Sequence, residues 1–185
     1  DSVEYIGESA FAECNSFIYL RLGKNVKFIG NYSFQNCLGF NGINNLPSTL
    51  ETLGEKAFYN CQNMVGDITI SDLITVINED TFNNCQKLNS VKFGKAIVEI
   101  AKNAFYNCIG LKEMSTFPSS LTRINESAFE QCVNIKSAIV IPDQVTVIES
   151  KAFKSCESLT SLKIGSKVAE IGEEDFRNCF ELSGS

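Results

Sequence analysis

The motif Phe-x-x-Cys recurs at a nearly constant interval along the chain and takes in all eight of its cysteines. The copies begin at Phe11, Phe34, Phe58, Phe82, Phe105, Phe129, Phe153 and Phe176. Successive cysteines stand 23, 24, 24, 23, 24, 24 and 23 residues apart. A fixed period of this length is typical of stacked repeats, each of which buries its apolar side chains against its neighbours. We therefore expect a single domain over residues 1–185, made of eight repeats of 23–24 residues.

Two short apolar patterns in each repeat predict two strands. The first alternates with period two, as in Val91-Lys92-Phe93, which is typical of a strand with one buried face. The second is an apolar pair such as Ile97 and Ile100, and we expect it to form a second wall opposite the parallel sheet built by the first. The Ala-Phe segment that follows predicts one helical or 3-10 turn. Glycines after the second strand predict a turn that needs a permissive backbone, at Gly7, Gly30, Gly54 and Gly172.

The combined pattern is Cys-x-x-Leu-x-x-Ile-x-Ile and then Val-x-x-Ile-Gly-x-x-Ala-Phe-x-x-Cys. It resembles the leucine-rich repeat of the BspA-like type, found in a class similar to bacterial and protist surface proteins. The resemblance covers essentially the whole chain. It implies a strand-rich α/β solenoid that is right-handed and curved, with the parallel sheet on its concave face. It also implies adhesion or protein binding, often at a cell surface, and the family has no catalytic residues to transfer.

Composition excludes several classes of function. The chain contains no histidine, which removes the commonest general base and the commonest zinc ligand. A formal net charge of -6 argues against nucleic acid, whose phosphates require a basic surface. No apolar run approaches the roughly 20 residues of a membrane-spanning helix, and the first residues do not resemble a signal peptide. We therefore expect no enzyme activity, no cofactor, no metal and no membrane insertion.

A longer period of 71 residues lies over the short one, because the spacing pattern 23, 24, 24 repeats. Basic residues recur with this longer period. They are Arg21, Lys92 and Lys163, at the outward position of the first predicted strand in every third repeat. The outward residues of the strands between them complete the set. The predicted contact residues of the concave sheet are thus Arg21, Asn44, Thr69, Lys92, Ser115, Val140 and Lys163. Strands about 4.8 Å apart would place the basic side chains roughly 14 Å from one another. They are either solvated positions inherited by duplication or a periodic face for an acidic, repetitive or extended ligand.

The cysteine column admits three interpretations. It consists of Cys14, Cys37, Cys61, Cys85, Cys108, Cys132, Cys156 and Cys179. Strands in a sheet are close enough for disulfides, but stacked identical side chains point the same way and pairing would break the symmetry. Metal binding requires ligands that converge on one point, whereas this column is a line. We favour a structural ladder of reduced, buried thiols with weak donor capacity toward neighbouring backbone, and leave disulfides and metal as alternatives.

Three smaller signals remain. Asn31 and Asn125 begin N-glycosylation sequons, which also arise by chance in a chain rich in Asn and Ser. Asparagine before the cysteine predicts side-chain hydrogen bonding within a turn. The carboxylates of residues 173–175 are interpreted as a solvated face, not as acid-base chemistry.

The chain begins midway through a repeat and ends as the next strand should begin, so neither end has a capping unit. Either it is a piece of a longer protein, or its open ends join further copies into an extracellular fibre. Our primary hypothesis is a non-enzymatic recognition or adhesion module of a surface or secreted protein, with extracellular or host proteins as partners. The alternative is a structural protein that assembles end to end.

Overall fold

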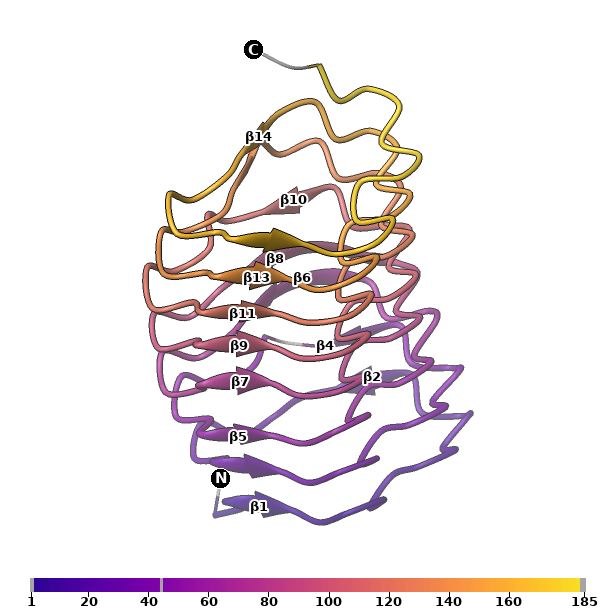
Figure 1. Ribbon diagram of the computed structural model, residues 1–185. Coiled ribbons are helices and arrows are strands. Elements are labelled where there is room, and N and C mark those ends of the chain that lie inside the picture. Colours follow the sequence, from indigo (N-terminus) through magenta and orange to yellow (C-terminus); the bar gives the residue numbers. More distant parts are fainter. Residues whose placement is uncertain (1, 44, 184–185) are drawn as a thin grey trace.

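The computed structural model describes residues 2–43 and 45–183, which form a solenoid of about seven turns (Figure 1). One turn, here called a coil, runs from one cysteine of the repeat to the next. The described residues form fifteen strands: β1 (Tyr5–Ile6), β2 (Tyr19–Leu20), β3 (Phe28–Ile29), β4 (Gly42–Ile43), β5 (Thr52–Leu53), β6 (Gly66–Thr69), β7 (Val76–Ile77), β8 (Leu88–Lys92), β9 (Glu99–Ile100), β10 (Glu113–Met114), β11 (Arg123–Ile124), β12 (Ile139–Val140), β13 (Val147–Ile148), β14 (Leu162–Lys163) and β15 (Glu170–Ile171).

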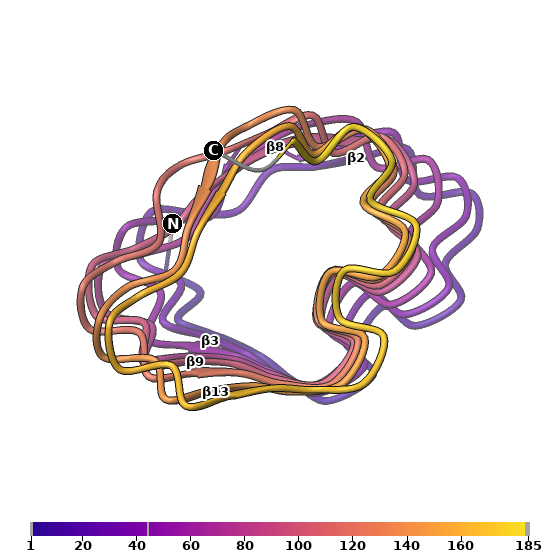
Figure 2. The ribbon, with the colours of Figure 1, turned by 45° about the horizontal axis from the view of Figure 1, so that its top comes forward.

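The strands form two walls on opposite sides of the core (Figure 2). The even-numbered strands make the first wall, in the groups β2-β4, β6-β8-β10 and β12-β14. The odd-numbered strands make the second wall, in the groups β1-β3-β5 and β7-β9-β11-β13-β15. Every pairing is parallel, because equivalent strands of successive coils run the same way. The prediction of a strand-rich solenoid with a parallel sheet and a second short-strand wall is thus confirmed.

Most strands alternate between the core and solvent, as their sequences predict, and β4 and β15 are exceptions. In the second wall Ile100 lies beside Ile77 and Ile124 and is fully buried, whereas its neighbour Glu99 is partly exposed. In the first wall Val91 is buried between Ile68 and Met114, and Lys92 points outward. The register keeps like residues in columns along the solenoid axis.

A third wall replaces the predicted helical turn. This turn wall comprises residues 8–14, 31–37, 55–61, 79–85, 102–108, 126–132, 150–156 and 173–179, and the described part of the chain contains no helix. Each copy has two residues with positive φ four positions apart, as at Lys56 (54°) and Asn60 (60°). Between and at these residues, alternate N–H groups donate to the next coil: Lys56, Phe58 and Asn60 donate to the carbonyls of residues 79, 81 and 83 at 3.0, 2.9 and 2.8 Å. A helix would need those N–H groups for itself, so the lateral bonds exclude it.

The asparagines before the cysteines occupy this left-handed conformation, which asparagine tolerates better than most residues. Their side chains also bond from coil to coil. Nδ2 of Asn60 donates to Oδ1 of Asn36 at 2.9 Å, and Nδ2 of Asn107 donates to Oδ1 of Asn84 at 2.7 Å. The predicted turn bonding is therefore an amide ladder between turns.

Three of the glycines after the second strand, Gly30, Gly54 and Gly172, have a different role from the predicted one. Gly54 does not have positive φ; that conformation falls two residues later, at Lys56. A Cβ on Gly54 would instead lie 2.5 Å from the backbone nitrogen of Asn31 in the preceding coil. Glycine is needed here because the two coils approach too closely for a side chain.

The repeated phenylalanines form one continuous stack through the core. Neighbouring rings of the Phe-x-x-Cys motifs, from Phe11 to Phe176, have centroids 5.2–5.6 Å apart and planes within 2–11° of parallel. The six rings from Phe34 to Phe153 are fully buried. This stack packs each coil against the next through the core.

Candidate recognition surface

The first wall presents its outward residues to solvent in one column. Arg21, Lys92, Ser115, Val140 and Lys163 are exposed, and Thr69 is partly exposed. Asn44, the remaining residue predicted there, lies outside the described residues. The structure brings some of them directly together: Thr69 pairs with Lys92, and Val140 pairs with Lys163.

Ser115 extends this column beside Lys92. Its backbone N–H donates to the carbonyl of Val91 at 2.9 Å, and its Oγ accepts from the N–H of Phe93 at 3.0 Å. The hydroxyl therefore serves partly to hold the wall together. Thr69, Lys92 and Ser115 make a continuous polar strip across three coils.

The three basic residues of the 71-residue period have no ion pair with any described residue. The neighbouring acids are held by other partners. Asp72 accepts the backbone N–H of Lys95 at 2.9 Å and lies 3.4 Å from its Nζ, and the first of these contacts lowers the pKa of Asp72. Lys92 and Lys163 contribute a weaker coulombic attraction that also lowers the pKa of Asp72 and Asp143, but neither amine forms an ion pair with a described residue.

Two shallow hollows follow the same period at the edge of the first wall. One, of about 410 Å³, lies between Ser48, Thr69, Asp72 and Lys92. Another, of about 360 Å³, is lined by Ser119, Val140 and Asp143. Ser119, Val140 and Asp143 stand 71 residues after Ser48, Thr69 and Asp72, so the duplicated sequence repeats the relief of the surface as well as its charge.

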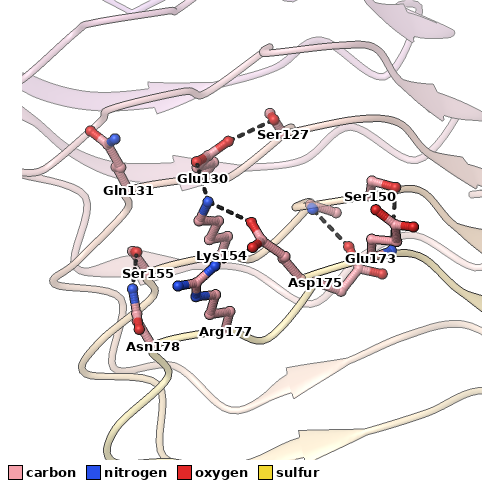
Figure 3. Close-up of polar contacts among 12 residues, drawn as sticks. Ser127, Glu130, Gln131, Ser150, Lys154, Ser155, Glu173, Asp175, Arg177 and Asn178 are labelled. Atoms are coloured by element: carbon pink, nitrogen blue, oxygen red, sulfur yellow. Dashed lines mark hydrogen bonds and ion pairs between the residues drawn. The ribbon is translucent and has the colours of Figure 1, made fainter.

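A polar cluster on the turn wall corrects the interpretation of Asp175, whereas Glu173 is exposed as expected (Figure 3). Asp175 is only 2% exposed; its two oxygens accept the N–H groups of Ala152 and Gly172, both at 2.8 Å. Burial raises the pKa of Asp175 to about 6. Lys154 donates to Glu174 at 2.7 Å and lies 3.8 Å from Glu130. These carboxylates are bonded within the fold, and the cluster links adjacent coils.

The cysteines are free thiols arranged in a ladder. The thiol of Cys61 donates to the carbonyl of Phe34 at 3.0 Å, and that of Cys132 donates to the carbonyl of Phe105 at 3.1 Å. Burial raises the pKa of the Cys61 thiol far above its usual range. The described residues contain no group of three or more potential metal ligands.

The two sequons lie in different environments. Asn31 is exposed, whereas Asn125 is partly buried and its Nδ2 donates to Glu99 at 2.8 Å. Ser33 and Ser127, the hydroxyl residues of the sequons, are both buried. Glycosylation of Asn31 and Asn125 remains a prediction, and the geometry favours Asn31.

One apolar part of the first wall was missed by the sequence reasoning. Ile18, Tyr19 and Val65 are 64%, 59% and 45% exposed. Comparison with the residues 71 positions later would have found them, because those residues are Asn89, Ser90 and Lys136.

The sequence model described as "BspA type Leucine rich repeat region (6 copies)" matches residues 1–66 and 64–183. The chain belongs to the BspA-type leucine-rich repeat family. No curated protein matches it. No helix in the described part of this family member has the length and apolarity needed to cross a bilayer.

Solved structures show the same repeat fold. The leucine-rich repeat protein of T. pallidum is 23% identical with a TM-score of 0.71, over 98% of this chain and 72% of that one. A leucine-rich cell surface protein of Faecalibacterium prausnitzii is 25% identical with a TM-score of 0.61, over 100% of this chain and 65% of that one. The pneumococcal vaccine antigen PcpA is 18% identical with a TM-score of 0.58, over 99% of this chain and 59% of that one. The BspA-type chain thus spans less than two thirds of the length of the last two.

Proposed function

We propose that this chain is a non-enzymatic recognition module of a surface or secreted protein, and that it binds a protein partner through the first wall. The supporting observation is the column that contains Arg21, Lys92 and Lys163. These side chains recur every 71 residues, are exposed on the first wall, and form no ion pair within the described residues. In a chain of net charge -6, such a column favours a partner with an acidic surface.

The family supports the class of function. Leucine-rich repeat proteins generally mediate protein interactions, and stacked repeats offer an extended surface without a deep pocket. The F. prausnitzii protein is described as a cell surface protein, which supports an extracellular or surface location here. Lack of histidine and the internal bonding of Glu130, Glu174 and Asp175 support a role without catalysis.

Charge reversal tests the proposal. The purified chain and the variant Arg21→Glu/Lys92→Glu/Lys163→Glu are applied to an array of extracellular proteins, and dissociation constants are measured for every protein that binds. We expect at least a tenfold loss of affinity for the variant, with a smaller salt dependence, because three exposed cations of the interface are replaced.

The matched control reverses three lysines outside the first-wall column, as Lys27→Glu/Lys87→Glu/Lys102→Glu. It changes the net charge by the same amount, and Lys27 and Lys102 form only exposed ion pairs of little weight for stability. Equal affinity losses in the two triple variants, or none in the first, would reject the first wall as the binding surface.

A further inference from the structure

Three residues of the first wall, Tyr19, Gly42 and Val65, form a continuous apolar row along the solenoid axis, and the exposed Ile18 precedes Tyr19 in the same coil. Tyr19 pairs with Gly42 in β2 and β4, and Gly42 forms a parallel bridge with Val65 in the next coil. Two ring carbons of Tyr19 lie 3.5 Å from the position that a Cβ on Gly42 would take, so the ring covers the Gly42 backbone. The apolar row therefore spans three coils on the outward face.

The stretch of chain 71 residues later, here called the duplicate, shows that the fold does not require this apolar surface. The residues 71 positions later are Asn89, Ser90, Glu113 and Lys136. Their backbone arrangement is the same: Ser90 pairs with Glu113, and the N–H of Lys136 donates to the preceding coil at 3.0 Å as that of Val65 does at 3.2 Å. The same framework thus holds polar residues in one copy and exposed apolar ones in the other. A contiguous exposed apolar patch of this kind is typical of an interaction site.

The charge beside the apolar row indicates what binds there. Arg21 follows Tyr19 by two residues on β2 and its extension, so both side chains leave the same face roughly 7 Å apart. Arg21 forms no ion pair with a described residue. Asp67, an outward acid of the same wall, already accepts hydrogen bonds from Asn89 at 2.8 Å and Ser90 at 2.6 Å, and these bonds lower its pKa.

We propose that the apolar row and Arg21 together bind an extended protein segment with an apolar side chain and a carboxylate two residues apart. In an extended chain, residues i and i+2 also point to one face roughly 7 Å apart, which matches the spacing of Tyr19 and Arg21. The apolar side chain packs on Tyr19 and Val65 while the carboxylate pairs with the guanidinium. Tyrosine and arginine, with tryptophan, are enriched among the residues that dominate binding energy in interfaces. The inference rests on the proposed function and specifies the segment that the first wall recognises.

The duplicate supplies matched variants for the test. The loss variant Tyr19→Ser/Gly42→Glu/Val65→Lys takes each new residue from the position 71 residues later. The gain variant Ser90→Tyr/Glu113→Gly/Lys136→Val makes the converse exchange beside Lys92, which occupies the position of Arg21. All these residues already occur at equivalent positions of the same fold, and circular dichroism with thermal unfolding verifies that each variant folds.

The probe is a phage library of random twelve-residue peptides selected on the immobilised chain. We expect enrichment of apolar-x-Asp/Glu sequences. A synthetic peptide with the enriched sequence should bind one site on the wild type and two sites on the gain variant. Its affinity for the loss variant and for Arg21→Glu should be at least tenfold lower than for the wild type. Titration calorimetry measures both the affinity and the number of sites.

The inference is overturned if no apolar-x-acid motif is enriched, or if the selected peptides bind the loss variant as tightly as the wild type. Should the loss variant not fold, Tyr19→Ser alone and the gain variant decide the same question. If the peptide test fails but the triple charge reversal weakens binding on the protein array, only this inference is rejected and the proposed function stands. Failure of both would reject the first wall as a recognition surface.

Discussion

Each buried cysteine thiol donates to a phenylalanine carbonyl of the preceding coil, and its environment makes it a poor nucleophile. Six of the eight cysteines are buried, Cys179 is partly buried and Cys14 is exposed. Burial raises the pKa of the Cys61, Cys156 and Cys179 thiols, which keeps them protonated at neutral pH.

We therefore expect one rapidly reacting thiol, Cys14, when the native chain is treated with a disulfide reagent such as DTNB at pH 7.5. Cys179 should react more slowly, and the six buried thiols only on unfolding. Absorbance at 412 nm counts the released thiolate, and the same reaction in guanidinium gives the total of eight. A native burst of three or more equivalents would contradict the ladder.

Asp175 gives stability a dependence on pH. Its folded pKa of about 6 lies above the ordinary 3.8, because the charged form is buried. Between about pH 4 and 6 the folded chain retains a proton that the unfolded chain has lost, so stability falls as pH rises through this window. Asp175→Ala, which places there the residue found at Ala152, should remove this fall.

Urea unfolding at pH 4 and pH 7 measures the effect. At each pH, the free energy of unfolding of the variant is compared with that of wild type. We expect this difference to favour the variant by about 1–3 kcal/mol more at pH 7 than at pH 4. The N–H groups of Ala152 and Gly172 keep backbone acceptors, so no donor is orphaned. Exposed Glu173→Ala is the control, and the same pH profile for Asp175→Ala and wild type would refute the assignment.

The phenylalanine stack is the element whose loss should cost most. Phe105 lies between Phe82 and Phe129 at 5.3 and 5.2 Å, and the ring of Phe93 lies nearly perpendicular to it with centroids 6.1 Å apart. Phe105→Ala should therefore reduce the free energy of unfolding by about 3–5 kcal/mol. Phe176 is only partly buried and contacts one ring of the stack, Phe153, so Phe176→Ala should cost less than half as much.

Urea denaturation followed by far-ultraviolet circular dichroism compares the two variants. The pair shares its chemistry and its place in the repeat, which isolates the effect of stacking on both sides. Similar losses would show that the stack is not the main source of cohesion between coils.

The sequence was a good guide to the two strand walls and a poor one to the turn wall. Period-two alternation and the apolar pair at Ile97 and Ile100 specify which side chains enter the core, and this determines the walls. The Ala-Phe-x-x-Cys spacing fits either a helical turn or two successive turns. Hydrogen bonding between coils decides between them, and a single repeat contains no sign of it. The Asn at residues such as Asn60, which tolerates positive φ, was the available signal.

The candidate site was predictable only in part, for a related reason. The outward column of Arg21, Lys92 and Lys163 follows from alternation and the 71-residue period. Burial of Asp175 does not, because its charge suggested solvent while its position in the repeat is one occupied by alanine. The apolar row was missed because its members look like ordinary strand residues until the duplicate shows polar ones in their place.

At the level of the whole molecule, each coil contacts only its neighbours. The protection of backbone amides from hydrogen exchange should therefore vary along the chain. We expect amides of residues 61–131 to exchange with deuterium most slowly, and those of the first and last coils fastest. Mass spectrometry of peptic fragments gives this profile. Uniform protection from end to end would indicate that the chain opens as a single unit.

The coil-to-coil hydrogen bonds of all three walls run along the solenoid axis. A pulling force applied at the two ends therefore acts on the hydrogen bonds of one outer coil at a time. The coils would open one after another, from the ends inward. Each opened coil would lengthen the tether by about 80 Å of chain. Such a protein, fixed at one end to a surface and holding a partner, would yield in small regular steps and so limit the tension on the contact that it holds.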